Sequence, residues 1–464
     1  MPLDLNRLLA ERSAEKYELH DRYLNSQLVR VLHTIGFDRD YVRGEGAYLY
    51  DREGNRYLDL LGGFGVFAVG RNHPAVVEAL RQVLAANLPN LVQMDVSALS
   101  GLLAERLLRH VPGAEKVFFC NSGAEAVEAA MKFARAATGR SRILHCEHAF
   151  HGLTFGALSL NGDDNFRAGF GPLLPGCAAV PYNDLGRLEA ALAQGDVAAF
   201  VVEPIQGKGV NLPDDDYLAE AARLCRRHGA LFVADEVQTG VGRTGRFLAL
   251  EHWGVEADMV LLAKALSGGF VPVGAVLLRK AIFDKVFDRM DRAVVHGSTF
   301  AKTDIAMAAG LATLEVLEDE NLIANAARVG EAILADLADL VGRFEFVHAV
   351  RGKGLMLAIE FGPPNSLRLK ASWALLEGAS KGLFSQLITI PLLQRHRILS
   401  QVAGHQMNVI KLIPPLTLGE ADRLWIRDAF EQVVADSHRV PGAAWELGRA
   451  LARHSLRGRR RRAA

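Results

Sequence analysis

The chain has 464 residues, enough for one large α/β domain with a smaller partner domain, and half of these residues are hydrophobic. Its 53 basic and 53 acidic residues balance, and this neutrality argues against a dominant role in binding nucleic acid. The four cysteines show no paired spacing and residues 1–20 contain no apolar signal-peptide core, so the sequence predicts a cytoplasmic protein.

The N-terminal segment predicts a helix followed by a β-hairpin. Leucines near helical spacing indicate a helix over residues 4–31, which we expect to pack on a partner subunit or on the smaller domain. Residues 47–59 contain two short apolar runs around a glycine-containing turn, a pattern typical of a hairpin. A glycine-rich loop over residues 62–70 and a helix over residues 74–86 follow.

A strand, a turn of small residues and a helix follow one another between residues 116 and 138. The turn contains Asn121, Ser122, Gly123 and Ala124, which would bring free backbone N–H groups and the positive end of a helix dipole to one point. Such a geometry binds phosphate. An equally open interpretation is simple N-capping of the helix by Asn121 or Ser122.

Three apolar runs that indicate buried strands end at Glu203, Asp235 and Lys264. In an open α/β sheet, ligands bind at the carboxyl edge, where these side chains would meet. A partly desolvated lysine can react with an aldehyde, and an aspartate can keep a pyridine nitrogen protonated. The set therefore suits pyridoxal phosphate, although Lys264 taken alone could simply cap its strand and point to solvent.

Two other patterns suggest ligands less specifically. Four potential zinc ligands match no standard spacing, so we predict no metal: His145, Cys146, His148 and His151. Gly240, Gly242 and Gly245 match the glycine pattern of dinucleotide-binding proteins. Because no clear strand-to-helix context surrounds these glycines, a non-enzymatic nucleotide-binding module is the weaker hypothesis.

Apolar strands alternate with helical stretches up to about residue 278, which is typical of a mostly parallel sheet wrapped by helices. A helix over 304–318 would link the domains, and a smaller α+β domain is indicated by the elements that follow it: helices over 321–341 and 420–437, and strands over 345–351, 355–361 and 408–412. The last helix would begin at a capping box over residues 417–420. We therefore divide the chain into an N-terminal segment that joins the small domain (1–60), a large domain (61–315), a small domain (316–440) and a basic tail (441–464).

Three motifs in a fixed order resemble the class III pyridoxal-phosphate aminotransferases, to which the ornithine, acetylornithine and putrescine enzymes belong. They are Asp235-Glu236-Val237-Gln238-Thr239-Gly240, Lys264 with Ser267-Gly268-Gly269, and His296-Gly297-Ser298-Thr299-Phe300. The resemblance runs from about residue 41 to about residue 436. It implies an α/β protein of fold type I, pyridoxal 5'-phosphate as the cofactor, and a homodimer with its active sites at the interface.

The resemblance also implies roles for individual residues. Lys264 would carry the cofactor covalently and then move a proton during transamination, while Asp235 would stabilise the protonated ring nitrogen. Gln238 would donate a hydrogen bond to the ring hydroxyl. Val237 and Phe150 would pack on opposite faces of the ring.

The remaining cofactor-side residues would orient and bind the charged groups. Glu203 would hold the polar residues around the cofactor in place. Five small residues would bind the phosphate, the last two of them from the other subunit: Ser122, Gly123, Ala124, Ser298 and Thr299.

The substrate side departs from the ornithine-type pattern. Leu153 stands where that pattern has arginine after the aromatic-x-glycine, Lys208 where it has glutamate after Pro-Ile-Gln-Gly, and Lys411 where it has arginine before Pro-Pro-Leu. Lysine only partly replaces the planar fork of arginine in binding carboxylates. Phe64 also makes the glycine-rich loop more apolar. The cofactor half of the site is therefore expected to be intact, and the half that would bind a small amino acid is remodelled.

Residues 382–405 contain the apolar run Leu387–Leu393, followed by polar residues. The run can be buried core with a polar face, or it can be an apolar wall for a long substrate. The second interpretation fits a further resemblance, carried by residues 41–74, 297–317 and 410–416, to a branch of the family associated with hopanoid side-chain amination.

We expect an aminotransferase that moves an amino group between a primary ω-amine, or an amino acid such as ornithine, and an aldehyde or keto partner. An aminomutase or racemase of the same fold is the alternative.

In the tail, Arg457–Arg462 follow an apolar helical pattern. The tail can be a solvated end, or it can attach the protein peripherally to an anionic membrane surface.

Overall fold

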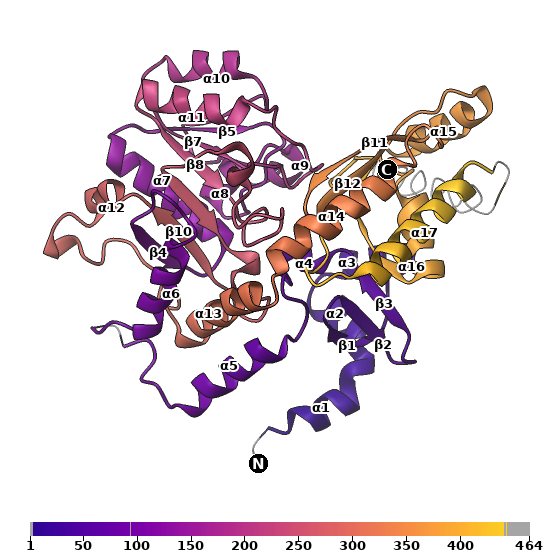
Figure 1. Ribbon diagram of the computed structural model, residues 1–464, viewed down its shortest axis with the longest axis horizontal. Coiled ribbons are helices and arrows are strands. Elements are labelled where there is room, and N and C mark those ends of the chain that lie inside the picture. The colour runs from indigo at the N-terminus through magenta and orange to yellow at the C-terminus, as the bar shows by residue number, and fades with distance from the viewer. Residues whose placement is uncertain (1–2, 93, 440–441, 443–464) are drawn as a thin grey trace.

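A seven-stranded sheet forms the centre of the larger part of the molecule in the computed structural model, which describes residues 3–92, 94–439 and 442 (Figure 1). The strand order is β4 (Lys116–Cys120), β10 (Gly274–Leu278), β9 (Met259–Leu262), β8 (Leu231–Asp235), β7 (Val197–Val202), β5 (Arg142–Cys146) and β6 (Cys177–Val180). Neighbours from β9 to β6 are parallel, whereas β10 is antiparallel to both β9 and β4. The predicted mostly parallel sheet is confirmed, with β10 as the exception.

Helices cover both faces of this sheet, because its strands are apolar on both sides. In β9, Met259 and Leu261 pack into the core on one face, and Val260 and Leu262 pack into the core on the other. The covering helices are α7 (Gly123–Thr138) and α12 (Lys280–Val286) on the first face, and α10 (Leu185–Leu192) and α11 (Tyr217–His228) on the second (Figure 1). The carboxyl ends of β7, β8 and β9 meet at one edge, as predicted.

Further helices join the large sheet to the rest of the chain. Three that pack together are α5 (Pro74–Ala85), α6 (Ala98–Leu108) and α13 (Asp304–Asp319), and the helices predicted over 74–86 and 304–318 are thereby confirmed. Two short helices, α8 (Phe155–Ser159) and α9 (Asp164–Arg167), follow β5.

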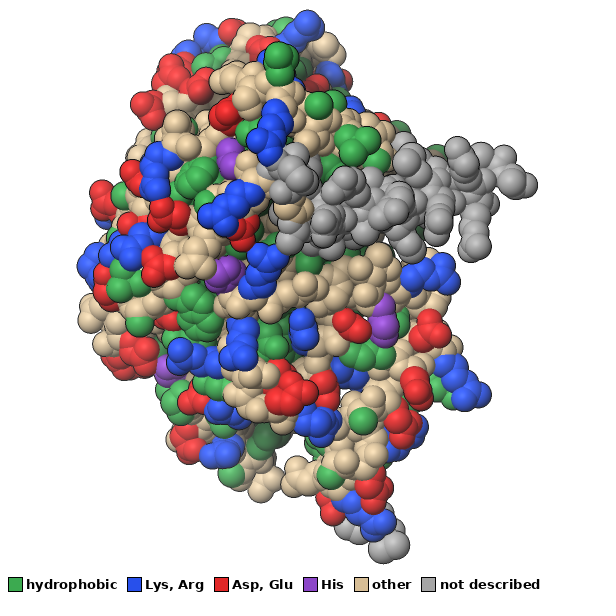
Figure 2. Space-filling view, turned by 90° about the vertical axis from the view of Figure 1, so that its right-hand side faces the viewer, with side chains coloured by type: hydrophobic (Ala, Val, Ile, Leu, Met, Phe, Trp, Pro, Cys, Tyr) green, Lys and Arg blue, Asp and Glu red, His purple; other side chains and the backbone are tan. Residues whose placement is uncertain are grey.

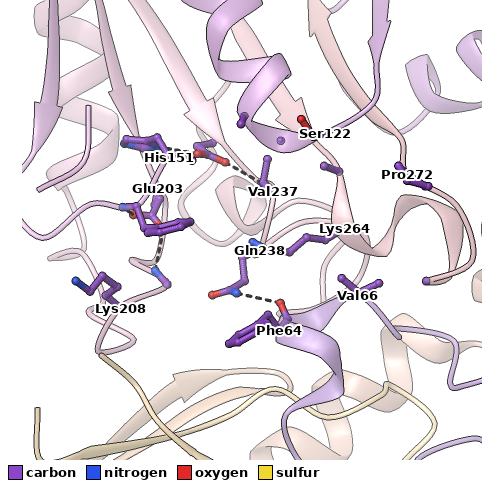
Figure 3. A pocket seen from close by; sticks show the side chains of 18 of the residues that line it. Phe64, Val66, Ser122, His151, Glu203, Lys208, Val237, Gln238, Lys264 and Pro272 are labelled. Atoms are coloured by element: carbon purple, nitrogen blue, oxygen red, sulfur yellow. Dashed lines mark hydrogen bonds and ion pairs between the residues drawn. The ribbon is translucent and has the colours of Figure 1, made fainter. Parts of the chain in front are cut away.

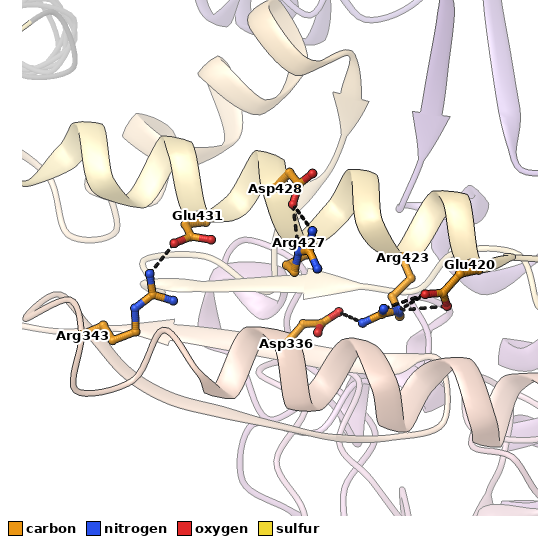
Figure 4. Close-up of polar contacts among 7 residues, drawn as sticks. All are labelled: Asp336, Arg343, Glu420, Arg423, Arg427, Asp428 and Glu431. Carbon is orange, nitrogen blue, oxygen red and sulfur yellow. Dashed lines mark hydrogen bonds and ion pairs between the residues drawn. The ribbon is translucent and has the colours of Figure 1, made fainter.

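A second, smaller sheet is antiparallel throughout. Its order is β11 (Val347–Lys353), β12 (Met356–Phe361), β15 (Val409–Leu412) and β14 (Gln401–Val402), and four helices accompany it: α14 (Leu322–Ala338), α15 (Leu367–Ala379), α16 (Gln386–His396) and α17 (Glu420–Ser437). Ion pairs connect α17 with α14 and the turn after α14 (Figure 4). Arg423 contacts Asp336 at 2.5 Å, and Glu431 pairs with Arg343.

The predicted N-terminal helix is wrong in its extent. The segment forms three shorter helices: α1 (Leu5–Arg12), α2 (Lys16–Tyr23) and α3 (Ser26–Ile35). Asn25 begins α3, because its side-chain oxygen accepts hydrogen bonds from the backbone N–H groups of Gln27 and Leu28, both at 3.1 Å. None of the residues of α1 is buried, and this helix projects from the molecule in Figure 1.

The predicted hairpin is confirmed as β2 (Tyr48–Asp51) and β3 (Arg56–Asp59), and β1 (Tyr41–Glu45) extends it. β13 (Ile398–Leu399) pairs with β3 in parallel, so strands from both ends of the chain form one sheet. Tyr48 Oη also donates a hydrogen bond to Asp422 in α17 at 2.6 Å, across 374 residues.

Two predictions for the C-terminal half need correction or refinement. The helix α17 begins after Gly419, and Asp422 accepts a hydrogen bond from the Gly419 N–H at 3.0 Å, so the predicted capping box at Thr417 and Glu420 is wrong in register. The apolar run Leu387–Leu393 lies within α16 and is buried throughout, which makes it core.

The predicted domain limits at residues 60 and 315 stay a prediction. Apart from residue 442, the predicted basic tail lies outside the described residues. Among the helices of the described ranges, none is both long and apolar enough to cross a bilayer. On the face shown in Figure 2, lysine and arginine side chains are interspersed with aspartate and glutamate, in keeping with the neutral composition.

Candidate active site

A cavity of about 780 Å³ opens at the carboxyl edge of the large sheet and is also lined by residues of the smaller sheet (Figure 3). Most of the predicted site residues line it: Phe64, Ser122, Gly123, Ala124, Phe150, Glu203, Lys208, Asp235, Val237, Gln238, Lys264 and Lys411. Residues 401–405 line it as well. The segment 382–405 is therefore divided, with its helix in the core and its last residues at the cavity.

Three predicted residues do not line the cavity. Leu153 is 55% exposed and follows Gly152, whose φ of +128° gives the chain a turn that other residues rarely adopt. Ser298 and Thr299 are exposed on the loop after α12. Ser298 Oγ accepts a hydrogen bond of 2.6 Å from Nδ2 of Asn121, which does line the cavity. This loop thus borders the cavity beside the start of α7.

Asp235 is buried at the end of β8, and both of its carboxylate oxygens have partners. Oδ2 accepts a hydrogen bond from Nδ1 of His151 at 2.7 Å, and Oδ1 accepts one from the backbone N–H of Val237 at 3.0 Å. Burial alone would lower the pKa of His151, but the hydrogen bond and charge of Asp235, together with the charge of Glu203, raise it. The two side chains form a buried ion pair that fixes the carboxylate.

His151 is the site residue that sequence reasoning missed. The sequence offers it only as a candidate zinc ligand with His145, Cys146 and His148, and within the described residues no group of three or more such side chains is placed to hold a metal. Its Nε2 is buried and has no hydrogen-bond partner in the described part of the chain. Its position directly after Phe150, in an aromatic-His-Gly triplet behind a strand, was the available signal.

Glu203, at the end of β7, fixes two loops of the site. Its Oε2 accepts a hydrogen bond from the backbone N–H of Phe150 at 3.0 Å, and its Oε1 accepts one from the N–H of Gly207 at 2.8 Å. Burial raises the pKa of Glu203, and the charge of Asp235 adds to this effect. Glu203 thereby positions the Phe150 ring, which contacts Phe166 edge-on with centroids 5.4 Å apart.

Lys264 follows β9 and has a left-handed backbone with a φ of +44°, which is uncommon for a residue with a side chain. Burial lowers the pKa of its ammonium group, although the charges of Asp235 and Glu203 oppose this shift. Figure 3 shows the side chain extending towards Gln238, between Val237 and Phe64. The strained turn therefore directs an amine of reduced basicity into the cavity.

The sequence left two roles open for the start of α7, namely N-capping of the helix and binding of a phosphate, and the structure is compatible with both. Ser122 caps the helix, since its Oγ accepts a hydrogen bond from the Glu125 N–H at 3.1 Å. The first N–H groups of any helix have no acceptor within that helix, so the turn can still bind an anion. A Cβ atom on Gly123 would lie 2.8 Å from Cγ1 of Val237, which restricts this position to glycine.

Gln238 and Lys411 form the floor of the cavity. Gln238 Nε2 donates a hydrogen bond to the carbonyl oxygen of Phe64 at 3.0 Å, and its Oε1 accepts one from Lys411 Nζ at 3.2 Å. Lys411 also donates to the carbonyl oxygen of Gly207 at 2.7 Å. Burial, helped by the charge of Lys264, lowers the pKa of Lys411 to about 7.

The buried Lys411 makes stability depend on pH. Between about pH 7 and the ordinary lysine value of 10.5, the unfolded chain binds a proton at this residue that the folded protein has released. Stability must therefore rise with pH in this interval. We expect the free energy of unfolding of the native protein, relative to that of Lys411→Met, to increase from pH 7 to pH 9 in urea titrations. A difference that does not change with pH would contradict the shifted pKa.

The glycine pattern at residues 240–245 does not form a phosphate loop. A Cβ on Gly245 would lie 2.7 Å from Cβ of Ala327 in α14, and Arg243 NH1 donates a hydrogen bond to the carbonyl oxygen of Leu355 at 3.1 Å. These residues pack the large sheet region against the smaller one. The geometry gives the nucleotide-binding hypothesis no support.

The family model described as aminotransferase class-III matches residues 33–434. The chain belongs to the class III aminotransferases. The aminotransferase PigE of Serratia sp. (strain ATCC 39006) is 34% identical to it over 90% of this chain. Because the match covers 53% of PigE, the chain spans about half the length of this curated relative.

Solved structures of other family members have the same fold. An ornithine aminotransferase from Toxoplasma gondii with partial occupancy of PLP is 29% identical, with a TM-score of 0.81 over 94% of this chain and 98% of that one. A PLP-bound amine transaminase from an uncultivated Pseudomonas species is 31% identical, with a TM-score of 0.74 over 86% of this chain and 94% of that one. This aminotransferase therefore has fold type I, and its cofactor is pyridoxal 5'-phosphate (PLP), on which class III aminotransferases depend.

The residues of the cavity fit this cofactor. The anion-binding turn at Ser122 and Gly123 suits a phosphate, the buried carboxylate of Asp235 suits a protonated ring nitrogen, and Lys264 supplies the amine that PLP requires. Both Gly123 and Val237 line the cavity, next to Asp235 and Lys264.

His151 is expected to act as a positioning residue in this aminotransferase. The change His151→Leu should lower kcat/KM roughly tenfold to hundredfold, because a hydrogen bond to a charged group contributes about 1.5–3 kcal/mol. His151→Asn, whose side-chain N–H can still donate to Asp235, should restore most of this loss. Steady-state kinetics of both variants test the role, and equal losses in the two would show that His151 only fills space.

Proposed function

We propose that this aminotransferase moves an amino group between a primary amine with an apolar body and an aldehyde or keto partner. The lining of the cavity carries this proposal, because aromatic and aliphatic side chains surround the space around Lys264: Phe64, Phe150, Phe166, Phe270 and Val402. No arginine lines the cavity in the described part of the chain. A small amino acid such as ornithine would thus lack a bidentate partner for its carboxylate, whereas the hopanoid-like substrate suggested by the sequence belongs to the apolar class.

The roles proposed for the site residues follow from their contacts. PLP, when bound, withdraws electrons from the substrate carbon that carries the amino group. Lys264 Nζ would take the proton from that carbon and deliver it to the cofactor, which requires the neutral amine that burial favours. Asp235 keeps the proton on the ring nitrogen, and His151 orients Asp235. Glu203 holds Phe150 against one face of the ring, with Val237 on the other.

The phosphate is proposed to bind at Ser122, Gly123 and Ala124. The homodimer, in which Ser298 and Thr299 of a second copy would complete this site, also belongs to the proposal. Its support is the exposure of large apolar side chains in the segments before α6 and after α12: Met94 is 97% exposed, Val96 84% and Val294 90%. Apolar side chains exposed to this extent are favourable to bury against a second copy of the chain. Attachment of the basic tail to an anionic membrane surface stays a prediction about residues outside the described ranges.

A screen of amine donors against the purified protein with PLP tests the proposed function. We expect long alkylamines to bleach the visible absorption of the bound cofactor more readily than ornithine does, and we expect catalytic turnover to require an added aldehyde or oxo acid. Turnover without a second substrate would instead indicate an aminomutase or racemase. A preference for ornithine over every alkylamine would contradict the proposed apolar substrate.

A further inference from the structure

Lys208 lies at the edge of the cavity, and its ammonium group already has an anionic partner. Its Nζ forms an ion pair with Asp163 and lies 5.2 Å from the centroid of the Phe166 ring. The two charged side chains are largely buried, with 13% of Lys208 and 19% of Asp163 exposed. Figure 3 places Lys208 well apart from Lys264, on the side of Glu203. Lys208 therefore lines a part of the cavity that is away from Lys264.

Asp163 is held in this place by the backbone. Its Oδ1 accepts a hydrogen bond of 2.9 Å from the N–H of Asn165, and the same carboxylate begins α9. Burial would raise the pKa of Asp163, but its hydrogen bonds with Lys208 and Asn165, together with the charges of Lys208 and His405, lower it. Asp163 is thus ionised at neutral pH and neutralises Lys208.

The other amines of the cavity cannot substitute for Lys208 in binding a carboxylate. Lys264 is reserved for the reaction centre, and Lys411 donates to Gly207 and Gln238. We propose that Asp163 is a specificity-determining residue, which withholds Lys208 from substrate carboxylates and so makes the enzyme select amines that have no carboxylate at their far end. This inference rests on the proposed function and names the substrate class more narrowly.

The variant Asp163→Asn tests this selection. Asparagine is an equally good N-cap and should leave α9 intact, while it removes the charge that holds Lys208. The substrates are pairs of equal length, such as hexylamine with 6-aminohexanoate and octylamine with 8-aminooctanoate. We expect the kcat/KM of the ω-amino acids, relative to the alkylamines, to rise by roughly tenfold or more, as for a new hydrogen bond to a charged group. The double variant Asp163→Asn, Lys208→Met should lose this gain.

Asp164→Asn is the matched control. It also removes one negative charge, at the next residue in the chain, but the side chain of Asp164 is 98% exposed. The inference would be overturned by a ratio of kcat/KM for ω-amino acids to kcat/KM for alkylamines that is unchanged in Asp163→Asn, or that rises equally in Asp164→Asn or in the double variant.

Calorimetric binding of hexanoate and hexanamide to the PLP-loaded protein gives a second readout that needs no turnover. Tighter binding of hexanoate alone in Asp163→Asn supports the inference, and equal affinities in variant and native protein overturn it. Failure of every amine to react would refute the proposed function, whereas hexanoate binding still decides this inference.

Discussion

Replacing Lys264 by alanine should abolish transamination while the protein still folds. In the proposed mechanism the amine at this position both bonds the cofactor and moves the proton, and neither of the other lysines that line the cavity is free to substitute, since Lys208 is paired with Asp163 and Lys411 donates to Gly207. We expect turnover to fall on the order of 10³-fold or more. The phosphate turn and the Asp235 carboxylate remain, so PLP should still bind, though without its covalent link.

Single-turnover kinetics with an alkylamine and the absorption spectrum of the PLP-loaded variant measure these effects. Lys280→Ala is a suitable control, because Lys280 is an exposed residue that pairs with Asp284 on α12. Substantial turnover in Lys264→Ala, with the control unaffected, would mean that another residue acts as the base.

The change Asp235→Asn should have the second largest effect. Asparagine keeps the size of the side chain and can still contact His151 and Val237, but it removes the negative charge that favours a protonated ring nitrogen. We expect kcat to fall on the order of 10³-fold, which corresponds to about 4 kcal/mol in the activation barrier. Thermal unfolding should shift less than activity does, because the amide oxygen can still accept from the Val237 N–H and the amide NH2 can donate to Nδ1 of a neutral His151.

Comparison with Asp163→Asn distinguishes the loss of a negative charge near the edge of the cavity from the loss of the negative charge of Asp235. That variant should keep its activity on alkylamines, whereas Asp235→Asn should lose activity on every substrate. A rate near that of the native protein in Asp235→Asn would show that the ring nitrogen is not held by this residue.

That Glu203, Asp235 and Lys264 meet at one cavity could be predicted from the sequence, because the signals for these residues are local. An apolar run such as residues 259–262 has few structural choices, and a polar residue at its end marks the carboxyl edge of the sheet. The antiparallel direction of β10 could not be predicted in the same way, since strand direction depends on the path of the chain between strands. The helix over residues 4–31 was wrong in extent because leucine spacing continues across the cap at Asn25.

The substrate side was less predictable because its contacts join residues far apart in sequence. Asp163 and Lys208 are separated by 45 residues, and neither carries a motif that predicts the pair. His151 was noticed, but its role depends on Asp235, 84 residues away. Leu153 was placed by its position in a motif, and the turn at Gly152 leaves it 55% exposed and outside the cavity.

The parallel pairing of β3 with β13 has a consequence for biosynthesis. The strand at residues 56–59 leaves the ribosome long before its neighbour at residues 398–399 exists. At roughly 5–20 residues per second, the hairpin must wait on the order of tens of seconds for this edge to be covered. During that interval β3 exposes an unpaired strand edge, which is a template for wrong association with other chains. Yield during expression should therefore depend on chaperones that bind nascent chains early, even though the finished protein has this edge closed.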